Sequence, residues 1–133
     1  EDKTNKVGIG TIGEFYTPFK LSEIIQMVKN NLNLKNMTYI GSPEKEISKV
    51  AICTGSGGSF INLAKQKGAD LYITGDIKYH TAIDANEINL AMIDAGHYGT
   101  EIICVKFISN YIKKEYNNID VFDIIENDPF FYA

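Results

Sequence analysis

The chain has 133 residues, a length that suits one domain with a hydrophobic core. Its apolar content of 44% and charged content of 23% are typical of globular proteins. A net charge of −4, with no basic run longer than two residues, argues against nucleic-acid binding, and the apolar runs are too short to span a bilayer.

The first third of the chain predicts a strand, a helix and a second strand. Residues Glu1–Lys6 are polar and are expected to fray. The glycine-containing stretch Val7–Tyr16 indicates a strand, and it lacks the strand–loop–helix context of a dinucleotide site. Leu21–Leu32 carries one apolar stripe at helical spacing, and Met37–Ile40 predicts a short strand.

From Lys49 onward the pattern alternates strictly between strand and helix, after a charged segment, Lys45–Lys49, that we expect to be exposed. The predicted strands are Val50–Cys53, Leu71–Thr74 and Leu90–Ile93, with Val121–Ile125 as an edge strand before a tail at Asp128–Ala133. The predicted helices are Phe60–Lys67, with Ser59 as N-cap and Gly68 at its end, Lys78–Glu87, and Thr100–Glu115 with Ile102, Val105, Ile108 and Ile112 facing inward. Cys53 and Cys104 lie in apolar runs without metal-type spacing, which predicts two reduced core thiols in a cytoplasmic protein.

This alternation predicts a three-layer α/β/α sandwich with a mostly parallel sheet, formed by residues 1–133 as a single α/β domain. The carboxyl ends of the parallel strands then meet at one edge, where open α/β sheets bind ligands. Three polar groups follow those ends: the loop Gly55–Ser59, Asp76 with His80, and Asp94 with His97 and Glu101. Both histidines of the chain therefore fall near the same edge.

His97 and Glu101 are four residues apart, so they share one face if a helix begins near His97. An imidazole and a carboxylate one turn apart suit a divalent metal such as zinc, manganese or iron. The alternative is a helix N-terminus at which Glu101 only complements the macrodipole. Two ligands alone make a weak site, because catalytic metal sites usually have at least three protein ligands.

The remaining candidates also have two interpretations each. The loop residues Ser56, Gly57, Gly58 and Ser59 form either a nest of N–H groups for an anion or only a tight turn. Asp76 either caps a helix or contacts substrate or metal, and His80 either reaches the cleft or is a solvated surface residue. No nucleophilic triad is visible, so metal-activated water is the better candidate chemistry.

Three segments in the same order resemble the C-terminal part of the Nif-three-like proteins, also described as dinuclear-metal-centre hexameric proteins or GTP cyclohydrolase I type 2 homologues. They are Ser56–Ile61 (SGGSFI), Gly68–His80 (GADLYITGDIKYH) and Ile93–Glu101 (IDAGHYGTE). The resemblance extends from about Val7 to Phe130. It implies a two-lobed α/β protein with two divalent metal ions (zinc, manganese or iron) in the cleft between the lobes.

The resemblance implies that His97 and Glu101 are the C-terminal metal ligands. The other ligands, a histidine pair and an aspartate, would come from an N-terminal lobe that this sequence lacks; no His-His pair is present. His80 and Asp76 would then line the cleft as substrate or proton-transfer groups, and Ser56–Ser59 would face an anionic group of a phosphorylated or nucleotide substrate. Thr11 stands where relatives often carry an arginine, so a cationic contact is lost there.

The resemblance further implies a hexamer in the cytoplasm and a metal-dependent hydrolase activity of the GTP cyclohydrolase type 2 kind in the full-length protein. A chain that starts at Glu1 and holds half of the ligands should bind metal weakly or not at all and should not catalyse alone. A non-catalytic metal-binding scaffold or regulatory interaction protein is the first alternative, and an oligomerisation module is the second.

Overall fold

The computed structural model describes residues 8–131 and contains one five-stranded sheet. The strand order is β1-β3-β4-β5-β2, with β3, β4 and β5 parallel and the outer strands β1 and β2 antiparallel to their neighbours. The strands are β1 (Thr11–Lys20), β2 (Thr38–Ile40), β3 (Glu46–Ser56), β4 (Leu71–Gly75) and β5 (Ala91–Asp94). The helices are α1 (Leu21–Asn31), α2 (Ile61–Gln66), α3 (Tyr79–Glu87), α4 (His97–Glu101) and α5 (Ile103–Glu115), with a 3-10 turn, η1, at Gly58–Phe60.

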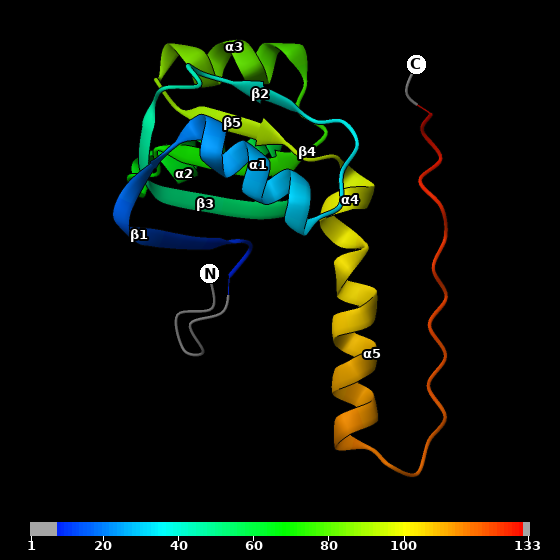
Figure 1. The fold of residues 1–133 in the computed structure, drawn as a ribbon. Coiled ribbons are helices and arrows are strands. Elements are labelled where there is room, and N and C mark those ends of the chain that lie inside the picture. The colour runs from blue at the N-terminus through cyan, green and yellow to red at the C-terminus, as the bar shows by residue number, and fades with distance from the viewer. Residues whose placement is uncertain (1–7, 132–133) are drawn as a thin grey trace.

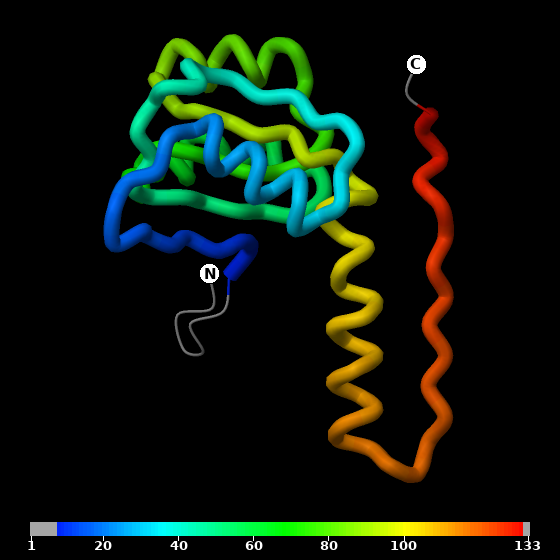
Figure 2. The backbone as a smooth tube through the Cα atoms, in the orientation of Figure 1, coloured from blue at the N-terminus to red at the C-terminus, as the bar shows by residue number. Residues whose placement is uncertain are grey.

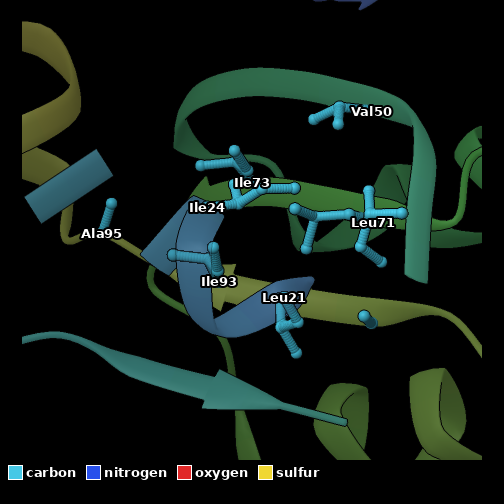
Figure 3. Close-up of a cluster of buried hydrophobic side chains, with 9 residues drawn as sticks. Leu21, Ile24, Val50, Leu71, Ile73, Ile93 and Ala95 are labelled. Atoms are coloured by element: carbon cyan, nitrogen blue, oxygen red, sulfur yellow. The ribbon is translucent and has the colours of Figure 1, made fainter. Parts of the chain in front are cut away.

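Helices cover both faces of the sheet, as the three-layer prediction requires (Figure 1). Along β4, Leu71 and Ile73 pack toward α1, whereas Tyr72 packs toward α2 and α3, because successive side chains of a strand point to opposite faces. Figure 3 shows the α1 side of this core, in which Leu21 and Ile24 of the helix lie against the sheet. The α/β/α architecture predicted from the alternating pattern is therefore confirmed.

Several predicted boundaries were wrong in informative ways. The strand predicted over Val7–Tyr16 runs from Thr11 to Lys20, and residues 1–7, including the stretch expected to fray, lie outside the described part. The segment expected to be charged and exposed, Lys45–Lys49, is largely strand, because Ile47 is fully buried in β3 against α1. Ser59 is not an N-cap: it lies inside η1, and α2 begins at Ile61.

The C-terminal part of the chain projects away from this body. The helix predicted as Thr100–Glu115 is divided at Ile102 into the short α4 and the long α5, and residues 116–131 then return beside α5 without regular secondary structure (Figure 2). We call α5 together with residues 116–131 the arm. The body is the sheet with α1 to α4.

The arm differs from prediction because little of the described chain covers it. Val121–Ile125 is not a strand, since it lies apart from the sheet. Ile108, expected to face inward, is about half exposed, and Cys104, expected in the core, is exposed. Both cysteines are free thiols, as predicted. Among the helices of residues 8–131, not one combines the length and the hydropathy that crossing a bilayer requires.

Candidate metal centre

His97 and Glu101 lie one turn apart on α4, directly after the carboxyl end of β5. Their side chains face one another, with His97 Nε2 at 3.2 Å from Glu101 Oε2. Both side chains are about half exposed. The four-residue spacing thus brings an imidazole nitrogen and a carboxylate oxygen together, which is the arrangement required for both to bind one metal ion.

Asp76 holds the other nitrogen of the same imidazole. Its Oδ2 lies 2.6 Å from His97 Nδ1. Asp76 follows β4 and adopts a positive φ of 55°, a conformation that aspartate tolerates better than most residues. A carboxylate on Nδ1 fixes the ring orientation and leaves Nε2 directed at Glu101, the arrangement that accompanies histidine ligands in many metal sites.

Asp94 joins the two loops that carry Asp76 and His97. Its Oδ2 accepts a hydrogen bond from the Ile77 backbone N–H at 2.8 Å, and its Oδ1 accepts one from the Gly96 N–H at 3.0 Å. One carboxylate at the end of β5 therefore spans the ends of two parallel strands. Because each bridged residue adjoins a side chain of the candidate centre, Asp94 sets the relative position of Asp76 and His97.

Glycine at two strand ends provides the space for this cluster. A Cβ on Gly55 would collide with the Glu101 carboxylate and lie 3.2 Å from His97 Nε2, and Gly55 also has a positive φ of 63°. A Cβ on Gly75 would lie 2.7 Å from the His97 backbone nitrogen. The backbones of β3 and β4 can approach α4 only because these two residues lack side chains.

The loop Ser56–Ser59 is adjacent to the candidate centre, but not all of its backbone N–H groups are available to a ligand. Gly57 donates to Thr74 Oγ1 at 2.9 Å, and its carbonyl accepts from the Tyr72 hydroxyl at 2.8 Å. Burial, with the neighbouring Cys53 adding, raises the pKa of Tyr72, so this hydroxyl remains a donor at physiological pH. The loop is therefore fastened to β4, and its proposed anion-binding role stays a prediction.

His80, by contrast, does not join the cluster. It is exposed on α3, and its ring packs edge-on against Tyr79, with centroids 5.7 Å apart. Within residues 8–131 it makes no side-chain hydrogen bond or ion pair. The shared sheet edge brought Asp76, His97 and Glu101 together, whereas the proton-transfer role predicted for His80 stays a prediction.

Comparison with known proteins identifies the family of this chain. The sequence profile of the family described as Duf34/NIF3 (NGG1p interacting factor 3) matches residues 2–129. The chain belongs to the Duf34/NIF3 family.

Its relatives carry the same description. The chain is 37% identical over 129 residues to a Clostridium perfringens protein called GTP cyclohydrolase 1 type 2 homolog, covering 95% of this chain and 49% of that protein. A protein of the same name from Clostridium acetobutylicum is 41% identical over 103 residues, which cover 74% of this chain and 38% of the relative. Among solved structures, a Bacillus cereus protein related to NIF3 matches with a TM-score of 0.80 and 32% identity over 95% of this chain and 36% of that one. The chain thus spans less than half the length of these relatives.

The electrostatics of the candidate centre favour a cation. The hydrogen bond to Asp76 raises the pKa of His97 above its ordinary value, partial desolvation opposes the shift, and the negative charges of Glu101 and Asp76 add to it. Two carboxylates thus flank one imidazole. In the absence of another cation they favour the imidazolium form of His97, and a divalent metal on Nε2 would take the place of that proton.

The donor atoms fit one divalent ion in spacing and chemistry. Bonds of about 2.0–2.2 Å at a tetrahedral angle place two donor atoms about 3.4 Å apart, close to the observed 3.2 Å between Nε2 and Oε2. Because Gly55 has no side chain, that residue places no atom between His97 Nε2 and the Glu101 carboxylate. Residues 8–131 contain no group of three or more metal-ligating side chains.

Sequence reasoning missed Thr100 and gave Asp94 no bridging role at the candidate centre. Thr100 is buried on α4, where its Oγ1 accepts from the Gly55 N–H at 2.9 Å and can donate to the Gly96 carbonyl at the same distance. Asp94 was noted only as the residue ending a strand, not as a bridge. A hydroxyl one residue before Glu101 and a carboxylate at the end of an apolar strand are weak signals, because both are also common surface features.

Proposed function

We propose that this chain is the C-terminal lobe of a dinuclear-metal-binding protein, a metal-dependent hydrolase of the GTP cyclohydrolase I type 2 homologue kind. One observation carries the proposal: His97 Nε2 and a Glu101 oxygen face one another at 3.2 Å, while Asp76 occupies the opposite ring nitrogen. A metal-binding histidine ordinarily has its other ring nitrogen hydrogen-bonded to a carboxylate, which is the position that Asp76 takes at Nδ1 of His97. The names of the relatives add the reaction class to this proposal.

The remaining ligands, in this proposal, belong to an N-terminal lobe of the same protein. Two protein ligands are fewer than catalytic sites usually employ. Two divalent ions, whether zinc, manganese or iron, would then lie between the lobes, and the homo-oligomer would be the hexamer that the family resemblance implies. The lobe alone should bind metal weakly and should not turn over substrate.

The chemistry we propose is attack of water on a phosphorylated or nucleotide small molecule. A divalent metal supplies Lewis acidity toward water and toward a carbonyl or phosphoryl oxygen. In this chain His97 and Glu101 hold the ion, Asp76 fixes the imidazole and exchanges protons at the cleft, and His80 reaches substrate from α3. The N–H groups of Ser56–Ser59 that are not used within the loop face the anionic group.

Calorimetric titration with zinc and with manganese tests the metal assignment. We expect weak binding to the 133-residue chain, tight binding of two ions to a protein of the relatives' full length, and loss of at least one ion on His97→Ala. His80→Ala is the matched control, because His80 lies near the same sheet edge without contacting Glu101, and it should leave metal affinity unchanged. Tight binding of two ions by the isolated chain, or equal effects of the two variants, would contradict the assignment.

Turnover requires a separate measurement. The full-length protein should hydrolyse GTP or another phosphorylated compound, with loss of the activity in His97→Ala. A non-catalytic scaffold or regulatory interaction protein is the alternative, and the exposed apolar side chains of the arm favour it, since such surfaces mark protein contacts. Retained metal and partner binding without turnover of any tested substrate would establish the scaffold.

A further inference from the structure

Two buried threonine hydroxyls hold Gly55 from two different elements. The Gly55 N–H donates to Thr100 Oγ1 of α4 at 2.9 Å, and the Gly55 carbonyl accepts from Thr74 Oγ1 of β4 at 3.1 Å. Thr74 is fully buried and Thr100 nearly so. The register of β3 against β4 shifts between Ile52 and Ser56, so Gly55 lies where the regular ladder is interrupted. Side-chain hydroxyls therefore bind both backbone polar groups of Gly55.

The Thr74 hydroxyl bonds in two directions. It donates its single hydrogen to the Gly55 carbonyl and accepts from the Gly57 N–H at 2.9 Å. The same N–H lies 3.1 Å from the Gly55 carbonyl oxygen, so the hydroxyl joins the two ends of a tight turn. Tyr72, on the same face of β4 as Thr74, donates to the Gly57 carbonyl at 2.8 Å. Strand β4 thus binds three backbone groups of the loop through two hydroxyls.

The loop lies too close to these hydroxyls to admit a side chain. A Cβ on Gly57 would lie 2.5 Å from both Thr74 Oγ1 and the Tyr72 hydroxyl oxygen. Since a Cβ does not approach an oxygen this closely, any larger residue at position 57 would push the loop away from β4. Hydrogen bonding and packing therefore set one distance between the loop and the strand.

Gly55 in turn limits the position of the Glu101 carboxylate. A Cβ on Gly55 would collide with this carboxylate and would lie 3.2 Å from His97 Nε2, so the glycine backbone borders both candidate ligands. A shift of Gly55 toward α4 would displace the carboxylate, and a shift away would remove a contact that restricts its rotation. The separation of 3.2 Å between Nε2 and Oε2 therefore depends on where Gly55 is held.

We propose that Thr74 is a positioning residue of the candidate metal centre. Its hydroxyl fixes Gly55, and the Gly55 backbone in turn keeps the Glu101 carboxylate against the imidazole. Within residues 8–131 the Thr74 side chain makes no hydrogen bond to His97 or Glu101, so it acts through the loop. The proposal rests on the metal-binding function proposed above and adds to it a residue outside the donor set.

Two substitutions separate the hydroxyl from the volume of the side chain. Thr74→Val keeps the branched shape and removes both hydrogen bonds, whereas Thr74→Ser keeps the hydroxyl and removes the methyl group. Ile73→Val is the matched control, because it trims the preceding residue of β4 on the α1 side of the sheet, away from the loop. Thr74→Cys, whose thiol bonds more weakly, gives a milder form of the same test if the valine variant does not fold.

NMR of the 133-residue chain without metal measures the position of Gly55. We expect a cross-peak between a Gly55 α-hydrogen and the His97 ring in the wild type and in the serine and control variants. Thr74→Val should lose this cross-peak while the amides of β4 stay protected from exchange, and Thr74→Cys should weaken it. Retention in Thr74→Val, loss in Thr74→Ser as well, or absence from the wild type would overturn the proposal.

Calorimetric titration of the full-length protein with zinc is the second readout. Thr74→Val should lower the affinity for at least one ion by about tenfold, at the lower end of the cost of losing a residue that orients a metal ligand. The serine and control variants should bind like the wild type. Equal affinity of the wild type and Thr74→Val would overturn the proposal. A wild type that binds no zinc would instead refute the function proposed above, and the cross-peak in the metal-free chain would still decide whether Thr74 fixes Gly55.

Discussion

The body and the arm are built from similarly apolar sequence, yet only the body buries its apolar residues within this chain. Ile93 of β5 is fully buried between layers, whereas Phe107 of α5 is largely exposed. The difference is one of partners: β5 has a helix on each face, while the described chain covers α5 on one side only. Hydrophobicity therefore indicated which side chains are stabilised by burial, but not whether this polypeptide itself supplies the surface that buries them.

The largest expected effect is in the body. Ile93→Ala should lower the free energy of unfolding by about 2–5 kcal/mol, because it leaves a cavity between α1 and the sheet. Urea denaturation followed by circular dichroism measures it. A loss below about 1 kcal/mol would show that the body is packed as loosely as the arm.

The next largest effect on stability is expected at Asp94, which bridges the loops after β4 and β5. Asp94→Asn places an amide where two backbone N–H groups need acceptors, so one of them loses its partner at a cost of about 1–3 kcal/mol. The loops that carry Asp76 and His97 should also separate, which NMR detects as a change in the His97 titration without a change at His80. Wild-type titration of His97 in the variant would remove Asp94 from the centre.

Acid should loosen the arm before it unfolds the body. The hydrogen bond from Ser109 lowers the pKa of Asp123, desolvation opposes this shift, and Lys113 adds to it. Since the pKa is lower in the folded arm, the contact contributes fully above the ordinary aspartate value and is lost as pH falls through the lowered one, below about pH 4. NMR cross-peaks between Ile112 and Phe122 should fade over that range, and an Asp123→Asn variant should lack this transition.

The smallest effect should be at an exposed apolar side chain of α5. Phe107→Ala in the 133-residue chain should change the free energy of unfolding by no more than about 0.5 kcal/mol, because the side chain loses little contact. The same urea experiment that measures Ile93→Ala provides the comparison. A loss above about 2 kcal/mol would mean that the arm is part of the folded core.

Local pattern was sufficient for most of the architecture. The apolar runs ending at Thr74 and Ile93, separated by amphipathic helices, predicted parallel strands and the edge at which Asp76, His97 and Glu101 meet. The four-residue spacing predicted that the last two would face one another. These features depend on residues near in sequence and on the handedness of strand–helix–strand connections, which all sequences share.

Tertiary structure alone decided the rest. Three contacts depend on the distance between strands, which no local pattern encodes. Asp76 bonds to Nδ1 of His97, Asp94 bridges two loops, and Gly55 leaves space for Glu101. The same limit explains the failed strand at Val121–Ile125: its residues have strand character, but a strand forms only where a neighbouring edge accepts its hydrogen bonds. The sequence alone determined which chemical groups the chain brings to its sheet edge, and the packing of strands and helices determined which of them touch.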